Sequence, residues 1–277
     1  MKKISLFVIL IALLHISQAQ DLRTPAPSPT QWVKQDFGLS SIELSYSRPG
    51  VKGRTIFGAV VPYGKVWRTG ANGATVISFG DDVMFGDVKV PAGKYGLLTL
   101  PGETEWVVIL TKALDVTSPA AYKTEMDVAR VKVKPEGLPF SLESFTILFS
   151  DVKSNTLNLD LIWDKTLVTV PIKTDVDTKV MADINEIMKS DNRPYYQAAV
   201  YYMNNGKDMN KALEWFNKAS DQEPDAYWVW YQKANCLAKM GKKSEALAAS
   251  NKSKQLATAQ KNEDYVTLNE NLQKTLK

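Results

Sequence analysis

Histidine and cysteine are almost missing from this chain of 277 residues, which has one of each, His15 and Cys236. His15 lies in an N-terminal segment predicted to be a signal peptide, so the mature protein would contain no imidazole. This excludes Ser-His-Asp and Cys-His catalysis, histidine zinc sites and an imidazole general base. One cysteine also excludes an intramolecular disulfide, and we expect neither a metal nor a cofactor.

The first residues have the pattern of a secretory signal peptide. Two lysines precede an apolar run over residues 4–14, and the sequence SQA at 17–19 is a small-x-small cleavage site. The run is shorter than the roughly 20 residues of a membrane-spanning helix, and no later segment is continuously apolar over that length. We therefore expect residues 1–19 to be a signal peptide and the mature protein to be periplasmic or secreted, without a transmembrane segment.

A large excess of charge is also missing. Without Lys2 and Lys3, 32 of the 34 basic residues remain against 30 acidic ones, which gives a net charge of +2. Proteins that bind nucleic acids commonly present a strongly basic surface, so the composition gives no support for a nucleic-acid partner.

Proline and glycine mark the organisation of the next part of the chain. Residues 20–31 contain three prolines spaced two positions apart, at 25, 27 and 29, and are predicted to be a Pro-rich linker. Short period-two runs then alternate with turn residues, which predicts an antiparallel β-sandwich or jelly-roll-like domain over residues 32–174. The predicted strands are 42–47, 66–69, 74–79, 83–85, 93–100, 106–110, 128–133, 145–149, 156–163 and 166–172.

Helical patterns follow the predicted sandwich. A bridging helix is predicted over 175–192 and a helical domain over 193–277, because apolar residues recur there three and four positions apart. An offset of 34 residues pairs Tyr196 with Trp230 and Ala212 with Ala246. This is the period of tetratricopeptide repeats, so we expect a short array of such helical hairpins.

Tetratricopeptide-like arrays bind protein segments in a concave groove. The first helix of each pair lines this groove, so we expect a protein partner to contact the helix that begins near residue 195. The candidate partner-binding residues are Tyr195, Gln197, Tyr202 and Asn204.

The most unusual segment is SRPGVKGRTIFGAVVPYGKVWRTGAN, residues 47–72, which contains several basic and aromatic side chains and no carboxylate. Its turns would display these side chains at the rim of the sandwich. Arginine offers forked donors to carboxylate or phosphate, and an aromatic ring can stack on a sugar, so the segment could bind an anion or an envelope glycan. The candidate ligand-binding residues are Arg48, Lys52, Arg54, Tyr63, Lys65, Trp67, Arg68 and Asn72.

A structural role for the same side chains is an open alternative. Buried arginines often donate to main-chain carbonyl oxygens while their stems pack on tryptophan. In this interpretation Asp81, Asp82 and Asp87, on a nearby predicted turn, would form ion pairs with the arginines.

A histidine-free glycosidase-like hydrolase is a third hypothesis. Two carboxylates suffice for glycoside hydrolysis, and Glu103 and Glu105 flank one predicted turn while Asp81 and Asp82 occupy another. No feature of the sequence singles out a pair, so we assign no catalytic residue and favour a protein that is not an enzyme.

Three blocks of the predicted sandwich resemble one known family. They read YSRPGVKGRTIFGAVVPYGKVWRTGAN, PAGKYGLLTLPGETEWVVIL and VARVKVKPEGLPFSLESFTILF, and they look like DUF2911, a family of unknown function found in Bacteroidetes-type genomes. Gly73 stands where the family typically has an acidic residue. The resemblance runs from about residue 28 to 174 and implies an exported protein of Gram-negative bacteria, often with a tetratricopeptide-like C-terminal part. It implies no activity.

The sequence therefore predicts an exported, non-enzymatic binding or scaffolding protein of the cell envelope. The helical repeats would bind a protein, and the sandwich would be a structural module or would bind a glycan or anion through residues 48–72.

Overall fold

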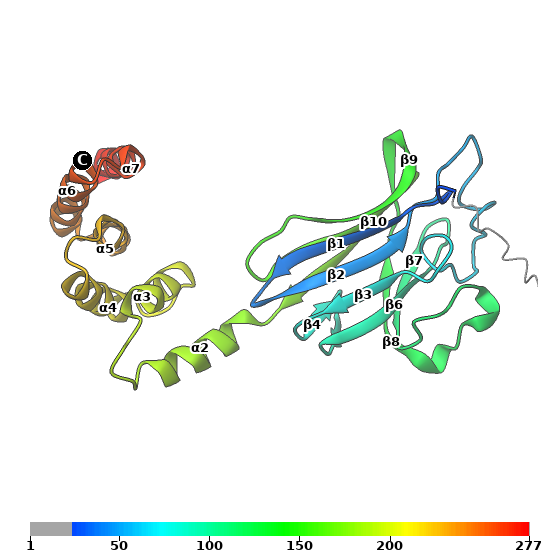
Figure 1. Cartoon of the computed structure of the whole chain (residues 1–277), viewed down its shortest axis with the longest axis horizontal. Helices are drawn as coiled ribbons and strands as arrows, with labels where there is room; N and C mark the ends of the chain where they lie inside the picture. Colours follow the sequence, from blue (N-terminus) through cyan, green and yellow to red (C-terminus); the bar gives the residue numbers. More distant parts are fainter. Residues whose placement is uncertain (1–23, 277) are drawn as a thin grey trace, which may run out of the picture. The chain divides into compact units, whose positions relative to one another are not determined.

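The computed structural model describes residues 24–276, which divide into two units between Val176 and Asp177. The first unit is built from antiparallel strands and the second from helices (Figure 1), so the predicted β-then-α layout is confirmed. The predicted signal peptide and the beginning of the predicted linker lie outside the described residues. Within residues 24–276, no helix has both the length and the apolar character needed to cross a membrane.

The larger sheet has the strand order β1-β2-β3-β6-β7-β8, and every neighbouring pair is antiparallel. Alternate residues of β2, such as Ile42 and Leu44, are buried on one face, whereas Glu43 points to the other face, which is open. The strands are β1 (Thr30–Phe37), β2 (Ser40–Ser47), β3 (Val76–Phe79), β6 (Gly93–Leu100), β7 (Trp106–Thr111) and β8 (Asp127–Val133).

The second sheet has the order β5-β4-β10-β9. Its longest segment, β10, folds back on itself, because the Thr174 main-chain NH donates to the Asn155 carbonyl oxygen at 3.0 Å. The reversal lies at Asp164, whose φ of 51° belongs to the left-handed region, within the turn that the sequence predicted at 163–166. The strands are β4 (Val83–Phe85), β5 (Val88–Val90), β9 (Glu136–Ser150) and β10 (Thr156–Thr174).

One hydrophobic core fills the space between the two sheets. It contains Ile77 and Val108 from the larger sheet and Leu159 and Val170 from the smaller one, all fully buried. Aromatic rings form one end of this core, and they are Tyr46, Phe57, Trp67, Trp106, Phe145 and Trp163. The first unit is therefore a sandwich stabilised by burial rather than by disulfides.

The strands differ from the sequence prediction at two places that affect the site. Residues 66–69 form no strand, and Trp67 instead makes an isolated antiparallel bridge to Thr99. Strand β1 was missed, and it begins inside the predicted linker at Thr30. Its period-two apolar pattern is weak, because Gln31 and Gln35 occupy two of its inward positions.

The second unit consists of helices that pack in chain order. From α3 to α7, each helix contacts the next, and α5 also contacts α7. Ala212 and Ala246, 34 residues apart, are fully buried and let neighbouring helices approach closely. The helices are α2 (Val176–Ile187), α3 (Tyr195–Asn204), α4 (Met209–Gln222), α5 (Tyr227–Lys239), α6 (Lys243–Ala259) and α7 (Glu263–Leu276), and the first unit has the short 3-10 helices η1 (Pro119–Ala121) and η2 (Thr124–Met126).

Candidate functional site

The basic segment of residues 47–72 begins along the outer edge of β9, the edge that does not face β10. The Arg48 guanidinium donates from Nε to the Phe145 carbonyl oxygen at 3.0 Å and from Nη2 to the Thr146 hydroxyl at 2.7 Å. An edge strand presents unpaired main-chain groups, and a guanidinium can satisfy them. Arg48 therefore bonds to the sheet.

Main-chain hydrogen bonds continue the same contact. The Phe145 NH donates to the Pro49 carbonyl at 2.9 Å, and the Val51 NH donates to the Glu143 carbonyl at 2.8 Å. β2 belongs to the larger sheet, and the segment that follows it is thereby joined to β9 at the edge of the smaller sheet. We call this contact the β9 seam, formed by Tyr46, Arg48, Pro49 and Val51 with Glu143, Phe145, Thr146 and Ile147.

Tyr46 completes the β9 seam from inside the core. Its hydroxyl accepts a hydrogen bond from the Ile147 NH at 2.8 Å and lies 3.1 Å from the Ile147 carbonyl oxygen and 2.9 Å from Gln31 Oε1. Burial raises the pKa of this tyrosine, and so the hydroxyl stays protonated. The seam thus has its polar groups paired.

The other two arginines also donate to main-chain oxygens. Arg54 donates from Nη2 to Gly50 at 2.7 Å and from Nε to Val51 at 3.1 Å, which closes its own loop. Arg68 donates from Nη1 to the Thr117 carbonyl. Because most of these arginine hydrogen bonds go to main-chain oxygens of separate segments, they match the structural alternative better than a shared anion site.

The remaining candidates of this segment are spread over different surroundings. The Trp67 indole stacks on Trp163, with ring centroids 5.6 Å apart, and donates to the Gly70 carbonyl at 3.0 Å, so its faces lie in the core. The Asn72 amide donates to the Ser28 carbonyl at 2.9 Å.

Three further candidates stay at the surface. Lys65 and Tyr63 are exposed, and no partner for either side chain is found among residues 24–276. Lys52 is exposed and is held by its main-chain NH, which donates to Glu143 Oε1 at 2.9 Å. Exposure leaves these three available to a ligand.

Two of the carboxylates proposed as arginine partners or as catalysts, Asp82 and Glu105, have other partners. Asp82 accepts from the Ala92 NH at 2.9 Å and lies 3.8 Å from Lys89 Nζ. Glu105 lies 2.9 Å from Lys132 Nζ. Asp82 therefore forms an ion pair within its own hairpin and not with the arginines, as the structural alternative had it, and Glu105 is paired with a lysine of β8.

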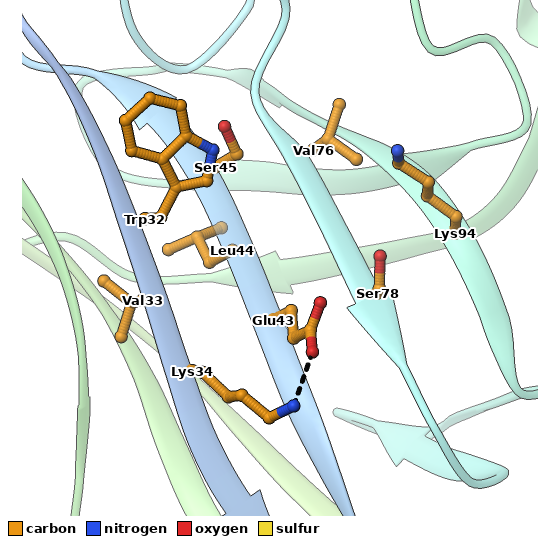
Figure 2. A pocket seen from close by; sticks show the side chains of 9 residues that line it. All are labelled: Trp32, Val33, Lys34, Glu43, Leu44, Ser45, Val76, Ser78 and Lys94. Carbon is orange, nitrogen blue, oxygen red and sulfur yellow. Dashed lines mark ion pairs between the residues drawn. The ribbon is translucent and has the colours of Figure 1, made fainter.

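A different surface has the geometry of a binding site. The open face of the larger sheet has a hollow of about 490 Å³ across β1, β2, β3 and β6 (Figure 2). Trp32 stands beside it with 75% of its surface exposed. We call this surface the Trp32 face, and its outward-pointing residues are Trp32, Lys34, Glu43, Ser45, Val76, Ser78 and Lys94.

Strand register arranges these side chains in two rows. In the first row Trp32 pairs with Ser45, Ser45 with Val76, and Val76 with Gly96. Ser45, Val76 and Gly96 are all much smaller than Trp32, so a trough forms beside the indole. A side chain at Gly96 would collide with the Ala113 carbonyl, which covers that end.

The second row is polar and runs parallel to the first. Lys34 pairs with Glu43, Glu43 with Ser78, and Ser78 with Lys94. Lys34 Nζ lies 2.9 Å from Glu43 Oε1, and this hydrogen bond raises the pKa of the lysine. Lys94 has no carboxylate partner among residues 24–276. The trough thus offers an aromatic face on one side and hydrogen-bond donors and acceptors along the other.

The predicted partner-binding residues of the helical unit divide into two pairs. Tyr202 packs edge-on against Trp215 of α4 at 4.6 Å, and Tyr195 lies beneath the Lys218 ammonium at 5.3 Å. These two side chains stabilise the contact between α3 and α4. Gln197 and Asn204 are exposed and remain available to a partner.

Other reactive groups do not assemble into a site. Within residues 24–276, no group of three or more His, Cys, Asp or Glu side chains could hold a metal ion. Cys236 is fully buried among the helices, and burial raises the pKa of its thiol. It is a packing residue rather than a nucleophile.

These observations define the first unit as an antiparallel β-sandwich whose open sheet face presents an indole beside a polar trough. The family model described as "Protein of unknown function (DUF2911)" matches residues 28–172, just over half of the 277 residues. The chain belongs to the DUF2911 family, and the match includes every residue of the Trp32 face and of the β9 seam. No curated protein and no solved structure matches the chain.

Proposed function

We propose that the protein binds a glycan of the cell envelope on the Trp32 face and does not act as an enzyme. The observation that carries this proposal is the exposed Trp32 indole beside a trough of small and polar side chains. A saccharide stacks an apolar ring face on an aromatic side chain and directs its hydroxyl groups to polar neighbours.

Covering the indole would supply much of the binding free energy. A tryptophan can bury about 150–250 Å², so covering all of its exposed three quarters is worth on the order of 3–5 kcal/mol. The hollow of about 490 Å³ lies within the usual range of ligand sites, roughly 300–1,000 Å³.

The polar row favours a glycan over a protein partner. Protein interfaces bury a larger apolar centre, whereas Trp32 and Val76 are the apolar members among the outward-pointing residues of this face. Lys34, Glu43 and Lys94 provide donors and an acceptor for hydroxyl, amide or carboxylate groups of a sugar.

Binding without hydrolysis is supported by the single carboxylate among the residues that line the trough. Glu43 is the carboxylate among the residues that line the hollow, and it is paired with Lys34. Glycoside hydrolysis generally needs two carboxylates roughly 5–9.5 Å apart. The predicted signal peptide supports an exported protein, and the periplasm or cell surface is where it would meet envelope glycans.

We also propose that the helical unit is tetratricopeptide-like and binds a protein, so that the whole chain links a glycan to a protein partner. The sequential packing of α3 to α7 and the buried alanines at an offset of 34 residues support this role. Gln197 and Asn204 are the predicted contact residues that remain exposed.

A glycan array that includes peptidoglycan fragments tests the first proposal. Trp32→Ala should abolish the binding seen with the wild-type protein without changing thermal stability, because the side chain is exposed. Phe140→Ala is the matched control, since it removes another aromatic ring, 58% exposed, from β9. Equal loss in both variants, or no binding by the wild-type protein, would contradict a site on the Trp32 face. Loss with Arg54→Ala and not with Trp32→Ala would assign the ligand to residues 48–72.

A further inference from the structure

We infer that a groove on the helical unit binds an acidic peptide segment through Lys233. The groove has a volume of about 370 Å³ and lies between α4, α5 and α6. Its walls include Leu213, Leu237 and Trp230, and its polar lining includes Asn217, Lys233 and Lys252. The inference rests on the proposed protein-binding role of the helical unit and assigns it a site and a chemistry.

Lys233 is a half-buried cation without a counter-ion. Its ammonium lies 4.6 Å from the centroid of the Trp230 ring and donates to the Ser220 hydroxyl at 3.2 Å. No carboxylate lies within 4 Å of it among residues 24–276. Burial lowers the pKa of this lysine, with a smaller opposing effect from Asp221. Partly buried charges are normally paired, so a carboxylate that enters the groove would complete the site.

Trp230 fixes the position of the ammonium. The indole NH donates to the Pro224 carbonyl at 2.9 Å, which holds the ring in place. Because the ring face and the Ser220 hydroxyl both contact the ammonium, the lysine is oriented before a ligand binds.

The other charges around the groove also favour an anionic partner. Lys252 adds a second ammonium, and Glu245 lies 3.8 Å from Lys242 Nζ. Nearby on α4, Glu214 lies 2.8 Å from Lys211 and 2.7 Å from Lys218. The carboxylates at this border are therefore already paired with lysines, and the groove has a positive excess.

The apolar walls distinguish a peptide from a simple anion. Leu213 and Leu237 line the groove together with small alanines of α6, which leaves room for an aliphatic side chain. A segment with a carboxylate next to a leucine would place the charge on Lys233 and the leucine against these walls.

A binding assay with a defined peptide tests the inference. The probe is a fluorescein-labelled decapeptide of alternating Asp and Leu, compared with the same peptide containing Asn in place of Asp, and fluorescence anisotropy measures its affinity for the chain of residues 20–277. We expect the Asp peptide to bind at least tenfold more tightly than the Asn peptide. Lys233→Met should remove that difference, and Lys252→Met should weaken binding about threefold, by loss of a more exposed charge.

Lys239→Met is the matched control, because Lys239 is an exposed lysine of the same helix, α5. It should leave the affinity within twofold. Circular dichroism establishes that each variant remains helical. If Lys233→Met unfolds, the affinity of Lys252→Met for the Asp peptide tests the inference instead, because Lys252 is exposed.

Three results would overturn the inference. They are equal affinity for the Asp and Asn peptides, no binding of the Asp peptide at millimolar protein, and equal loss in Lys239→Met and Lys233→Met. If the Asp peptide binds and Lys233→Met has no effect, this groove is also ruled out as the site, and another part of the chain binds the acidic peptide.

Discussion

Replacing Tyr46 by phenylalanine tests the β9 seam at a single atom. The substitution removes the hydroxyl that accepts from the Ile147 NH, while the ring can keep its edge-on contact with Phe145, at 5.8 Å between centroids. Ile147 is buried, so its NH would be left without an acceptor.

The expected cost follows from that unpaired group. Leaving a buried donor unsatisfied costs about 1–3 kcal/mol, so we expect Tyr46→Phe to lower the free energy of unfolding by about 2 kcal/mol. For a unit of this size the melting temperature would fall by roughly 4–8 °C. Urea unfolding, followed by tryptophan fluorescence, measures the change, since Trp67 and Trp163 report on the same core.

The matched control is Tyr63→Phe. Tyr63 is 39% exposed and its hydroxyl has no partner among residues 24–276, so its loss should change stability by less than about 0.5 kcal/mol. If Tyr46→Phe is as mild as this control, the seam does not depend on the hydroxyl and our reasoning about the edge of β9 is wrong.

Three further predictions concern the described residues. Arg48→Met should lower the free energy of unfolding by about 1–3 kcal/mol in the same urea assay, because the Phe145 carbonyl loses its charged donor, whereas Lys65→Met should have no effect. Gly86→Ala should destabilise the first unit by about 1–2 kcal/mol or more, because φ is +60° and the new Cβ would lie 2.6 Å from Val131 Cγ1; thermal unfolding checks this, with the open, exposed Gly73→Ala as control. Cys236 should react with a thiol reagent only after the helices unfold in urea, and rapid reaction of the native protein would contradict its buried position.

Local sequence patterns predicted most of the strands whose inward residues are apolar, although the short strand β5, with Val88 and Val90, was missed. Strand β4 was predicted with its observed bounds, because Val83 and Phe85 alternate with the exposed Met84. Strand β1 lacked this signal, since glutamine occupies inward positions there. The helices were predicted for a similar reason, because the helical period and the alternation of a strand both depend on residues close in the sequence.

The candidate site depends on contacts that are distant in the sequence. Whether Arg48 binds a ligand or the protein is decided by Phe145, 97 residues away, and no local pattern shows that pairing. The Trp32 face arises from the register of four strands, which places Trp32, Ser45 and Val76 in one row. A tryptophan and a lysine two positions apart at the start of the sandwich were the available signal, because they share a face of a strand.

The most direct test of the glycan-binding proposal follows the indole NH signals of the ¹⁵N-labelled protein during titration with a glycan selected from the array. We expect the Trp32 signal, assigned by its absence in Trp32→Ala, to shift in a saturable manner, while the buried Trp163 signal stays in place. Saturable shifts of other tryptophans with an unchanged Trp32 signal would contradict a binding site on the Trp32 face.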